Sequence, residues 1–493
     1  MARRGGVVAA GHALTAQAGA HTLRAGGNAV DAALAAMLTS FVAEPLLTGL
    51  GAGGYMLVAG AGVEPALLDF FVEAPGRGVA GEARGELVPI DVFFGDVVQV
   101  FHVGAASCGA YGVPAGVCVA AERWGSVALA ELVVPAAALA REGVALNAEQ
   151  AYVAEILSAL LLSSPECAAL WAPGGQVLRE GDVLVNGELA DALERLGSEG
   201  AEPFYRGDIA DAVCRFLADR GGTLTARDLR EYRAVDREPV RASYRGRELL
   251  TNPPPSAGGI LLAYSLALLA RTAGPPSVSE ILAAMEAAQA ERTPEFLEDL
   301  DREGFADAFL ASRLGATTHI SVLDAAGLAC SVTCTNGEGS GMVVPGTGLH
   351  VNNIMGEQDL NPLGFHRHPP GRRMPSMMAP SVVLHDDGVE LVLGSAGSNR
   401  IRSALLQTIV AVIDHGMGAE EAVRAPRVHF EDGMVYAEPG VDVEPLEARG
   451  QTVARFRALN LFFGGVQAIR CDPVTGEVTG AGDPRRGGVA VAA

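Results

Sequence analysis

The chain is poor in positive charge, in aromatic residues and in cysteine. Its 493 residues include 36 Lys and Arg against 58 Asp and Glu, which gives a formal net charge of -22. No basic tract offers the surface that phosphate binding requires, so a nucleic-acid partner is not expected. An acidic surface of this kind mostly serves solubility.

The seven cysteines are an odd number, scattered along the chain and without any C-x-x-C spacing. This pattern indicates neither a disulfide framework nor a zinc site, and we expect reduced, buried thiols. The stretch His366-Arg367-His368 invites a metal hypothesis, but no carboxylate follows at ligand spacing. We therefore expect no bound metal.

Long apolar runs are also missing. The run from Ala32 to Ala43 lies between Asp31 and Glu44 and is too short to cross a bilayer, so it predicts a buried helix and no membrane partner. Arg3-Arg4 and the apolar residues after it resemble an export signal, but His12 and Thr15 interrupt the apolar stretch. We expect a cytoplasmic protein, with export as the alternative.

Apolar residues are abundant, at 49% of the chain, and no linker-like tract divides it. One large, interwoven α/β body is expected. Near the start, a strand over 6–10 should lead to a helix over 14–23. Gly26-Gly27-Asn28 should end that helix and begin the next, with Asp31 completing a capping box. The second helix is hydrophobic nearly all round, which predicts a place in the core.

The glycines from Gly49 to Gly54 fit the pattern G-x-G-x-x-G, and Asp69 follows about twenty residues later, as in dinucleotide-binding proteins. The order of elements is reversed, however. The glycines follow a helix and precede a strand-like segment over 55–59, whereas the dinucleotide motif needs the strand first. No cofactor is expected.

The middle of the chain is predicted to be scaffold. We expect a capped helix opened by Thr225 to Asp228, a strand over 241–250, and a rigid turn over 253–259 that leads into an apolar helix over 260–269. Residues 277–314 have a helical pattern with charged outer faces.

The residue pattern changes from helical to strand-like at Thr317. Residues 318–323 and 328–335 predict two strands joined by the turn Asp324 to Gly327, with Thr317 at the leading end. A threonine hydroxyl is a poor nucleophile until a base stands beside it, and cutting the chain before the threonine would supply its own α-amine. The pKa of such an amine, about 7.7 to 8.0, suits a general base. Structural threonines far outnumber catalytic ones, so the hairpin alone identifies nothing.

The joint pattern along nearly the whole chain resembles the γ-glutamyltranspeptidase family of N-terminal-nucleophile (Ntn) hydrolases. The matching segments are Gly26 to Ala33, Glu44-Pro45, Gly49 to Gly54, Phe204 to Gly207, Pro253 to Gly259, Thr317-Thr318-His319, Asn352-Asn353, Met378-Ala379-Pro380, Gly394 to Gly397 and Asp483-Pro484-Arg485. The resemblance implies a four-layer αββα sandwich. It also implies a precursor that cuts itself between Ala316 and Thr317 into a large subunit (1–316) and a small subunit (317–493), interleaved in one body.

The resemblance also assigns roles at the reacting centre. Thr317 would be the nucleophile, and the hydroxyl of Thr335 would hold it in place. The backbone N-H groups of Gly397 and Ser398 would form the oxyanion hole. Because only main-chain donors are needed, serine at the second place is tolerable.

The residues at the family's substrate-binding positions differ in this chain. Phe71 falls at or near the place of an arginine that grips the α-carboxylate of γ-glutamyl substrates, and the loss of that arginine should cost about 1.5 to 3 kcal/mol of binding. The family's assisting Ser-Ser pair is Ser376-Met377 here. The family's ligands for the substrate amine are better retained in this sequence. The matching residues are Asn352, a carboxylate from Glu357 or Asp359, and Asn336.

Two features of the sequence could compensate for the missing arginine. Arg372 or Arg373 could replace the missing cation, the alternative being a surface pair on a Pro-rich loop. Otherwise an acyl pocket of Phe70, Phe71, Met374 and Met377 would be apolar and would suit an acylase.

Three functions follow as hypotheses. The first is cleavage of the γ-glutamyl amide of glutathione or a related compound through a threonyl acyl-enzyme, with transfer to water or an amino acid. The second is an Ntn acylase with a non-glutamyl, more apolar acyl specificity. The third is an uncleaved, non-catalytic scaffold. In the first two, the partners are a small-molecule amide and the chain's own second subunit.

Overall fold

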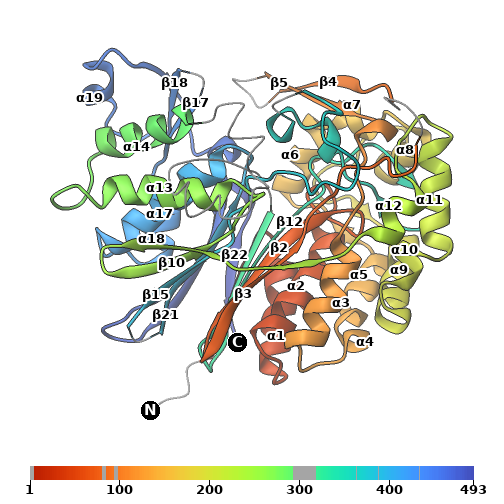
Figure 1. The fold of residues 1–493 in the computed structure, drawn as a ribbon, viewed down its shortest axis with the longest axis horizontal. Helices are drawn as coiled ribbons and strands as arrows, with labels where there is room; N and C mark the ends of the chain where they lie inside the picture. Colours follow the sequence, from red (N-terminus) through yellow and green to blue (C-terminus); the bar gives the residue numbers. More distant parts are fainter. Residues whose placement is uncertain are drawn as a thin grey trace.

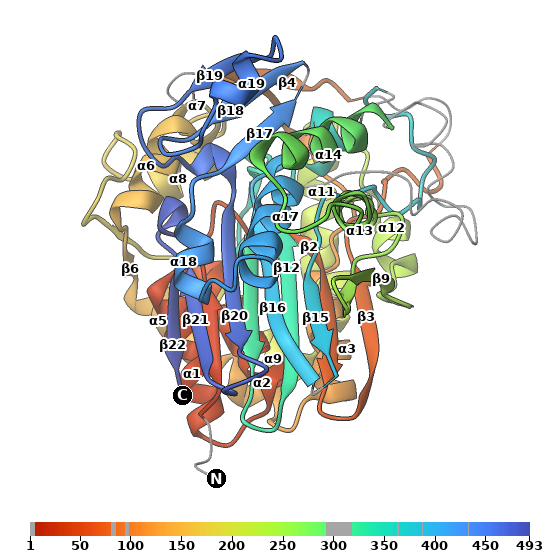
Figure 2. The same cartoon turned by 90° about the vertical axis from the view of Figure 1, so that its left-hand side faces the viewer.

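Two β-sheets packed face to face form the centre of the molecule, and helices cover the outer face of each (Figures 1 and 2). The structure is a computed structural model that describes residues 5–79, 85–93, 98–291, 318–361, 364–386, 388–431 and 433–493. Strand β11 of one sheet lies against β16 and β20 of the other. The predicted αββα sandwich is confirmed.

The first sheet has seven strands in the order β22-β1-β11-β12-β2-β3-β8. Their bounds are β22 (Val489–Ala492), β1 (Val7–Ala10), β11 (Thr318–Leu323), β12 (Leu328–Thr335), β2 (Gly53–Gly60), β3 (Val63–Phe70) and β8 (Val235–Arg237). Strands from before and after residue 317 are interleaved in this order, because β1 lies between β22 and β11, and β2 lies beside β12. Such interleaving is what two subunits cut from one folded precursor would require, although the division itself stays a prediction.

The second sheet has six strands in the order β21-β20-β16-β15-β10-β9. Their bounds are β21 (Val478–Gly482), β20 (Gly465–Cys471), β16 (Gly388–Ala396), β15 (Ser381–His385), β10 (Arg247–Thr251) and β9 (Val240–Tyr244). The segment 241–250, predicted to be strand-like, is divided into two strands. Arg245 and Gly246 have φ values of 49° and 77°, and this left-handed turn folds the segment into the hairpin β9-β10.

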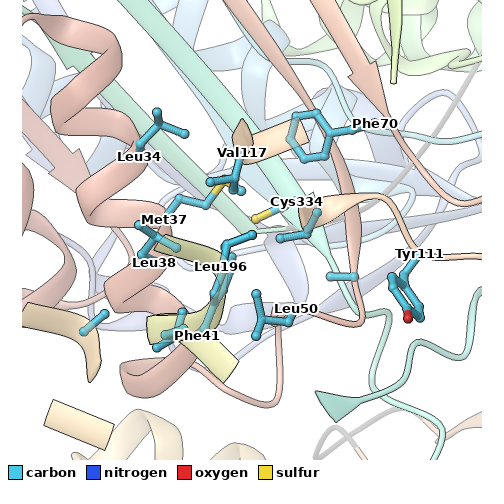
Figure 3. Close-up of a cluster of buried hydrophobic side chains, with 14 of the residues drawn as sticks. Leu34, Met37, Leu38, Phe41, Leu50, Phe70, Tyr111, Val117, Leu196 and Cys334 are labelled. Atoms are coloured by element: carbon cyan, nitrogen blue, oxygen red, sulfur yellow. The ribbon is translucent and has the colours of Figure 1, made fainter. Parts of the chain in front are cut away.

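Helix α2 (Ala29–Ala43) covers the first sheet, and every one of its residues is buried. Asn28 and Asp31 form the predicted capping box at its start. Figure 3 shows Leu34, Met37, Leu38 and Phe41 in the cluster of apolar side chains that α2 shares with neighbouring elements. The prediction of a helix that is apolar all round and lies in the core is confirmed.

Further helices complete the two outer layers (Figure 1). Those beside the first sheet include α1 (Ala13–Arg24), α3 (Val113–Trp124), α5 (Val134–Glu142) and α9 (Gly187–Glu199), and those beside the second are α13 (Gly258–Leu269), α14 (Val278–Ala290), α17 (Arg400–Ile413) and α18 (Ala419–Arg424). Helix α14 accounts for the first part of the helical pattern predicted over 277–314. Residues 292–314 lie outside the described residues.

Shorter elements surround this frame. They are β4 (Val88–Phe93), β5 (Val98–Val103), η1 (Ala105–Ser107), α4 (Leu129–Leu132), β6 (Val144–Ala145), α6 (Ala148–Ile156), α7 (Ser158–Leu161), α8 (Pro165–Trp171), β7 (Val183–Leu184), α10 (Glu202–Tyr205), α11 (Asp208–Ala218), α12 (Ala226–Glu231), β13 (Val343–Val344), β14 (Leu349–His350), η2 (Ile354–Gly356), η3 (Gln358–Leu360), β17 (Val428–Glu431), β18 (Met434–Ala437), α19 (Glu444–Glu447), β19 (Thr452–Arg455), η4 (Leu461–Phe463) and η5 (Pro484–Arg486). All seven cysteines are free thiols. Within the described ranges, no helix is both long enough and apolar enough to cross a membrane.

Candidate active site

The predicted nucleophile directly precedes a central strand. Strand β11 begins at Thr318, between β1 and β12, and Thr318 pairs with Cys334 of β12. Thr317 and Ala316 lie outside the described residues, and so does the bond predicted to be cut. The site is therefore described from Thr318 onward.

A pocket opens at this end of β11 and holds about 690 Å³ of empty space, its open mouth included. It brings together four of the predicted site residues, Thr335, Glu357, Gly397 and Ser398. The other described residues that line it are Leu47, Phe101, Val153, Ile156, Leu157, Thr318, Gly337, Glu338, Arg400, Leu461 and Arg486. Residues far apart in the sequence thus meet beside the start of β11.

Thr335 is the last residue of β12. Its hydroxyl oxygen accepts a hydrogen bond from the backbone N-H of Gly337 at 2.7 Å, which fixes the side chain at the wall of the pocket. Thr335 pairs with Gly53 of β2, and Cys334 before it pairs with Thr318 of β11, so neighbouring strands hold the backbone here on both sides. Its predicted action on Thr317 stays a prediction.

Gly397 and Ser398 form the turn between β16 and α17. Gly397 has a φ of 121° and Ser398 a φ of 51°. A side chain on Gly397 would bring its Cβ within 2.6 Å of Cα of Gly464, so glycine is required on both counts. The turn stands at the amino-terminal end of a 14-residue helix, where backbone N-H groups and the helix dipole favour negative charge. This geometry is suitable for an oxyanion.

Two guanidinium groups stand in the same wall. The Nε of Arg400 donates to the carbonyl oxygen of Phe462 at 3.0 Å, and its guanidinium carbon lies 4.7 Å from the centre of the Phe462 ring. Arg486 is half-buried, and desolvation followed by the charge of Arg400 lowers the pKa of its side chain to about 10. Both guanidinium groups line the pocket together with Gly397.

Asn336 and Asn352 are buried and are not among the described residues that line the pocket. The Nδ2 of Asn336 donates to the carbonyl of His350 at 3.1 Å. The Nδ2 of Asn352 donates to the carbonyls of Gly51 and Gly109, and its Oδ1 accepts from the N-H of Gly109. These amides hold loops together, and a contact with substrate stays a prediction for both.

Ser376 and Met377 are also buried and are likewise not among the lining residues. The hydroxyl oxygen of Ser376 accepts from the N-H of Met378 at 3.0 Å. Asp359 lies in η3, and its side chain is outside the described part of the chain. The structure thus brings Glu357 to the pocket and leaves Ser376 and Met377 in the protein interior.

Arg373 is neither a surface residue nor a described part of the pocket wall. It is 7% exposed and forms ion pairs with Asp69 at 3.5 Å and Glu73 at 3.6 Å. Its guanidinium donates to the carbonyl of Phe71 and to the hydroxyl of Tyr232. The interpretation of Arg373 as half of a surface pair is wrong, because the two carboxylates draw it inward.

The predicted apolar acyl pocket also needs correction. Phe70, Phe71, Met374 and Met377 are at most 1% exposed, and Phe71 stacks on Tyr55 with ring centres 5.6 Å apart. They belong to the protein core. The apolar part of the pocket comes instead from Leu47, Phe101, Val153, Ile156, Leu157 and Leu461.

Sequence reasoning missed several residues of this wall. Arg486 directly follows the matched segment Asp483 to Arg485, and Arg400 lies three residues after the matched segment Gly394 to Gly397, so their nearness to these segments was a usable signal. The apolar residues of α6 carry no such signal, because their pattern is that of any packed helix.

Comparisons with known proteins agree with this arrangement. The family described as Gamma-glutamyltranspeptidase matches residues 15–313 and 303–493. The chain is 34% identical to the Acylase ACY 1 proenzyme of Pseudomonas sp. (strain V22), covering 99% of this chain and 93% of that protein. It is 31% identical to the Glutathione hydrolase proenzyme of Escherichia coli (strain K12), covering 97% and 90%.

Among solved structures, the cephalosporin acylase from Bacillus halodurans superposes with a TM-score of 0.85 at 26% identity, covering 99% of this chain and 96% of that one. The similarity therefore extends over both sheets and both helical layers. The family match over nearly the whole chain, together with these relatives, establishes that this protein belongs to the γ-glutamyltranspeptidase family of Ntn hydrolases and transferases.

Proposed function

We propose that the protein is a self-cleaving threonine hydrolase that opens an amide through an acyl-enzyme on Thr317. The observation that carries the proposal is the pocket at the start of β11, where Thr335, Gly397 and Ser398 converge. Strand β11 pairs Thr318, the residue after the proposed nucleophile, with Cys334, the residue before Thr335. We therefore expect the nucleophile and its predicted partner to share one edge of the pocket.

The chemistry would run in two stages. In the precursor, the Thr317 hydroxyl attacks the carbonyl of Ala316, the peptide C-N bond breaks, and water hydrolyses the resulting ester. In the mature enzyme, the freed α-amine takes the proton of the Thr317 hydroxyl as it attacks a substrate amide. The N-H groups of Gly397 and Ser398 stabilise the oxyanion, the proton passes to the leaving amine, and water or an amine releases the acyl group.

For the acyl donor, the walls of the pocket favour an acylase. Six apolar side chains line it, from Leu47, Phe101, Val153, Ile156, Leu157 and Leu461. The positions matched to the family's carboxylate ligands, Phe71 and Ser376-Met377, are buried away from this wall. The similarity to ACY 1 and to a cephalosporin acylase also supports this choice.

Cleavage of a γ-glutamyl amide is the second candidate. Glu357 lines the pocket at a position matched to the family's amine ligands, and Arg400 and Arg486 supply cations for a carboxylate. Glutathione hydrolases of about the same identity as the acylase relatives support it too.

A panel of chromogenic anilides separates the two candidates. We expect aliphatic or aromatic acyl anilides to be cleaved with a kcat/KM at least about tenfold above that of the γ-glutamyl anilide, since filling an apolar pocket is worth roughly 1 to 3 kcal/mol. Saturation by the γ-glutamyl anilide with no reaction of the others would overturn the acylase proposal. The control is Thr317→Ala, which should be inactive toward every member. An intact, inactive wild-type chain would favour the scaffold hypothesis.

A further inference from the structure

A buried carboxylate stands behind the start of β11. Glu44, which follows the last residue of α2, is 2% exposed. Its Oε1 accepts a hydrogen bond from the hydroxyl of Thr15 at 2.8 Å, and its Oε2 accepts one from the hydroxyl of Thr318 at 3.4 Å. A Cβ on Gly11 would lie 2.5 Å from Oε2, so the absence of a side chain there makes room for the carboxylate. The site is a closed cradle with two hydroxyl donors.

The position of Thr318 links this cradle to the pocket. Thr318 is the first residue of β11, it lines the pocket, and it directly follows the predicted nucleophile. Glu44 is not among the lining residues, so it would act through Thr318 rather than on a substrate. Its contact with Thr318 joins the end of α2 to the first residue of β11.

The charge of Glu44 can change near neutral pH. Burial raises its pKa to about 7, against the lowering effect of Thr15, Thr318 and Arg486. Around it, the pKa of Arg486 in η5 is about 10, and burial raises that of Cys334 in β12 to about 12. Burial lowers the pKa of His12, which follows Gly11 in the chain. Of these described neighbours, none gains or loses charge between neutral pH and about 9.

We propose that Glu44 is a positioning residue for chain scission at Thr317, which fixes the first residue of β11 by accepting a hydrogen bond from the hydroxyl of Thr318 while ionised. This inference rests on the proposed self-cleavage. Ionised Glu44 can accept from both Thr15 and Thr318, whereas protonated Glu44 must donate one hydrogen and so weakens one of these contacts. In the precursor the nitrogen of residue 317 is an amide and does not titrate. If the scission rate changes with pH near neutrality, the group that gains or loses a proton must therefore be a group other than this nitrogen.

The test is the rate of scission of freshly synthesised full-length chain, followed on denaturing gels across about pH 5.5 to 9. In the wild type, the rate should rise with a midpoint near pH 7. Glu44→Gln should be about tenfold slower at the upper end and should lose this midpoint, because a neutral amide replaces a charged acceptor. Thr15→Val keeps the carboxylate but removes a hydrogen bond that lowers its pKa, so its midpoint should move to higher pH.

The outcomes separate this inference from the proposed function. A wild-type chain that is never cut before Thr317 overturns the proposed function. A wild-type chain that is cut, together with a Glu44→Gln chain that is cut at the same rate with the same midpoint, overturns only the role of Glu44. If Glu44→Gln fails to fold by circular dichroism, Thr15→Val decides, and an unmoved midpoint in that variant contradicts the inference.

Discussion

Arg373 is held in the protein interior by two carboxylates, Asp69 at 3.5 Å and Glu73 at 3.6 Å. Both carboxylates belong to a segment some three hundred residues earlier. Such long-range ion pairs set the position of a side chain and leave no periodicity behind.

Arg373→Met should therefore lower stability rather than change substrate affinity. It leaves Glu73 with Arg77 alone and Asp69 with Arg237 alone, and the loss of a buried partner should cost about 3 kcal/mol of unfolding free energy. Urea unfolding measures this cost. The matched control is Arg241→Met, whose ion pairs with Glu64 and Glu248 are exposed and should be worth under about 1 kcal/mol. A raised KM in Arg373→Met, with unchanged stability, would instead favour a substrate-binding role.

At the scale of single elements, local sequence was informative wherever local physics decides. Strands β11 and β12 begin and end where the β-branched pattern and the turn Asp324 to Gly327 place them. The capping box of α2 was likewise predicted correctly from the local sequence. The split of β9 and β10 was missed because Arg245, a residue that rarely adopts positive φ, does so here while its side chain binds Asp414 and the carbonyl of Thr272.

The turn between β16 and α17 provides an element-scale prediction. Gly397→Ala places a Cβ 2.6 Å from Cα of Gly464 and forces a φ of 121° on a residue with a side chain. The backbone donors would shift, so kcat should fall by about 100-fold with little change in KM. Steady-state kinetics on the cleaved enzyme measures both. Ser398→Gly keeps the backbone N-H and relieves a positive φ, and it should retain wild-type kcat. A Gly397→Ala enzyme with normal kcat would remove this turn from the mechanism.

The junction of α2 and β11 provides a prediction on pH and stability. The pKa of Glu44 is raised from 4.5 to about 7 in the folded protein, so its favourable contribution is complete below about pH 4.5 and is lost as the pH rises through 7. In the uncut Thr317→Ala background, adding Glu44→Gln should therefore raise relative stability by about 3 kcal/mol between pH 4.5 and 8. Urea midpoints at the two pH values give this difference. A constant difference would show that Glu44 does not titrate in this range.

The whole molecule depends on the contact between its two sheets. His319 of β11 lies in that interface, where its Nδ1 and the hydroxyl of Thr333 are 2.7 Å apart and its Nε2 and the hydroxyl of Ser321 are 2.9 Å apart. Its ring fills the space above Gly394 of β16, where a Cβ would meet Nδ1 at 2.2 Å. Close approach of the sheets behind the site therefore requires glycine at this position.

Gly394→Ala should destabilise the folded protein by about 1 to 3 kcal/mol, because the added methyl group overpacks the interface between the sheets. Thermal or urea unfolding of the uncut Thr317→Ala background measures this effect. Gly187→Ala, at the first position of α9 with nothing within 4 Å of the added Cβ, is the control and should be neutral. Equal stability of the two variants would mean that the sheets can separate locally at no cost.

At this scale the αββα class could be predicted, and the composition of the pocket could not. The sequence resemblance predicted the αββα sandwich. It also assigned Thr335, Gly397, Ser398 and Glu357 to one site, and the structure brings them to one pocket. It could not assign the remaining walls, because Leu47, Val153, Leu461 and Arg486 come from four separate segments that meet only when both sheets and their loops are assembled. We expect these walls to select the acyl group of the substrate.

The central claim is that the chain cuts itself before Thr317. Amino-terminal sequencing, with intact mass, of the purified mature protein tests it most directly. The account predicts two fragments of 316 and 177 residues, the second beginning with Thr317-Thr318-His319, and one uncut chain for Thr317→Ala. A preparation that still cleaves amides but has no new amino terminus at Thr317 would contradict it.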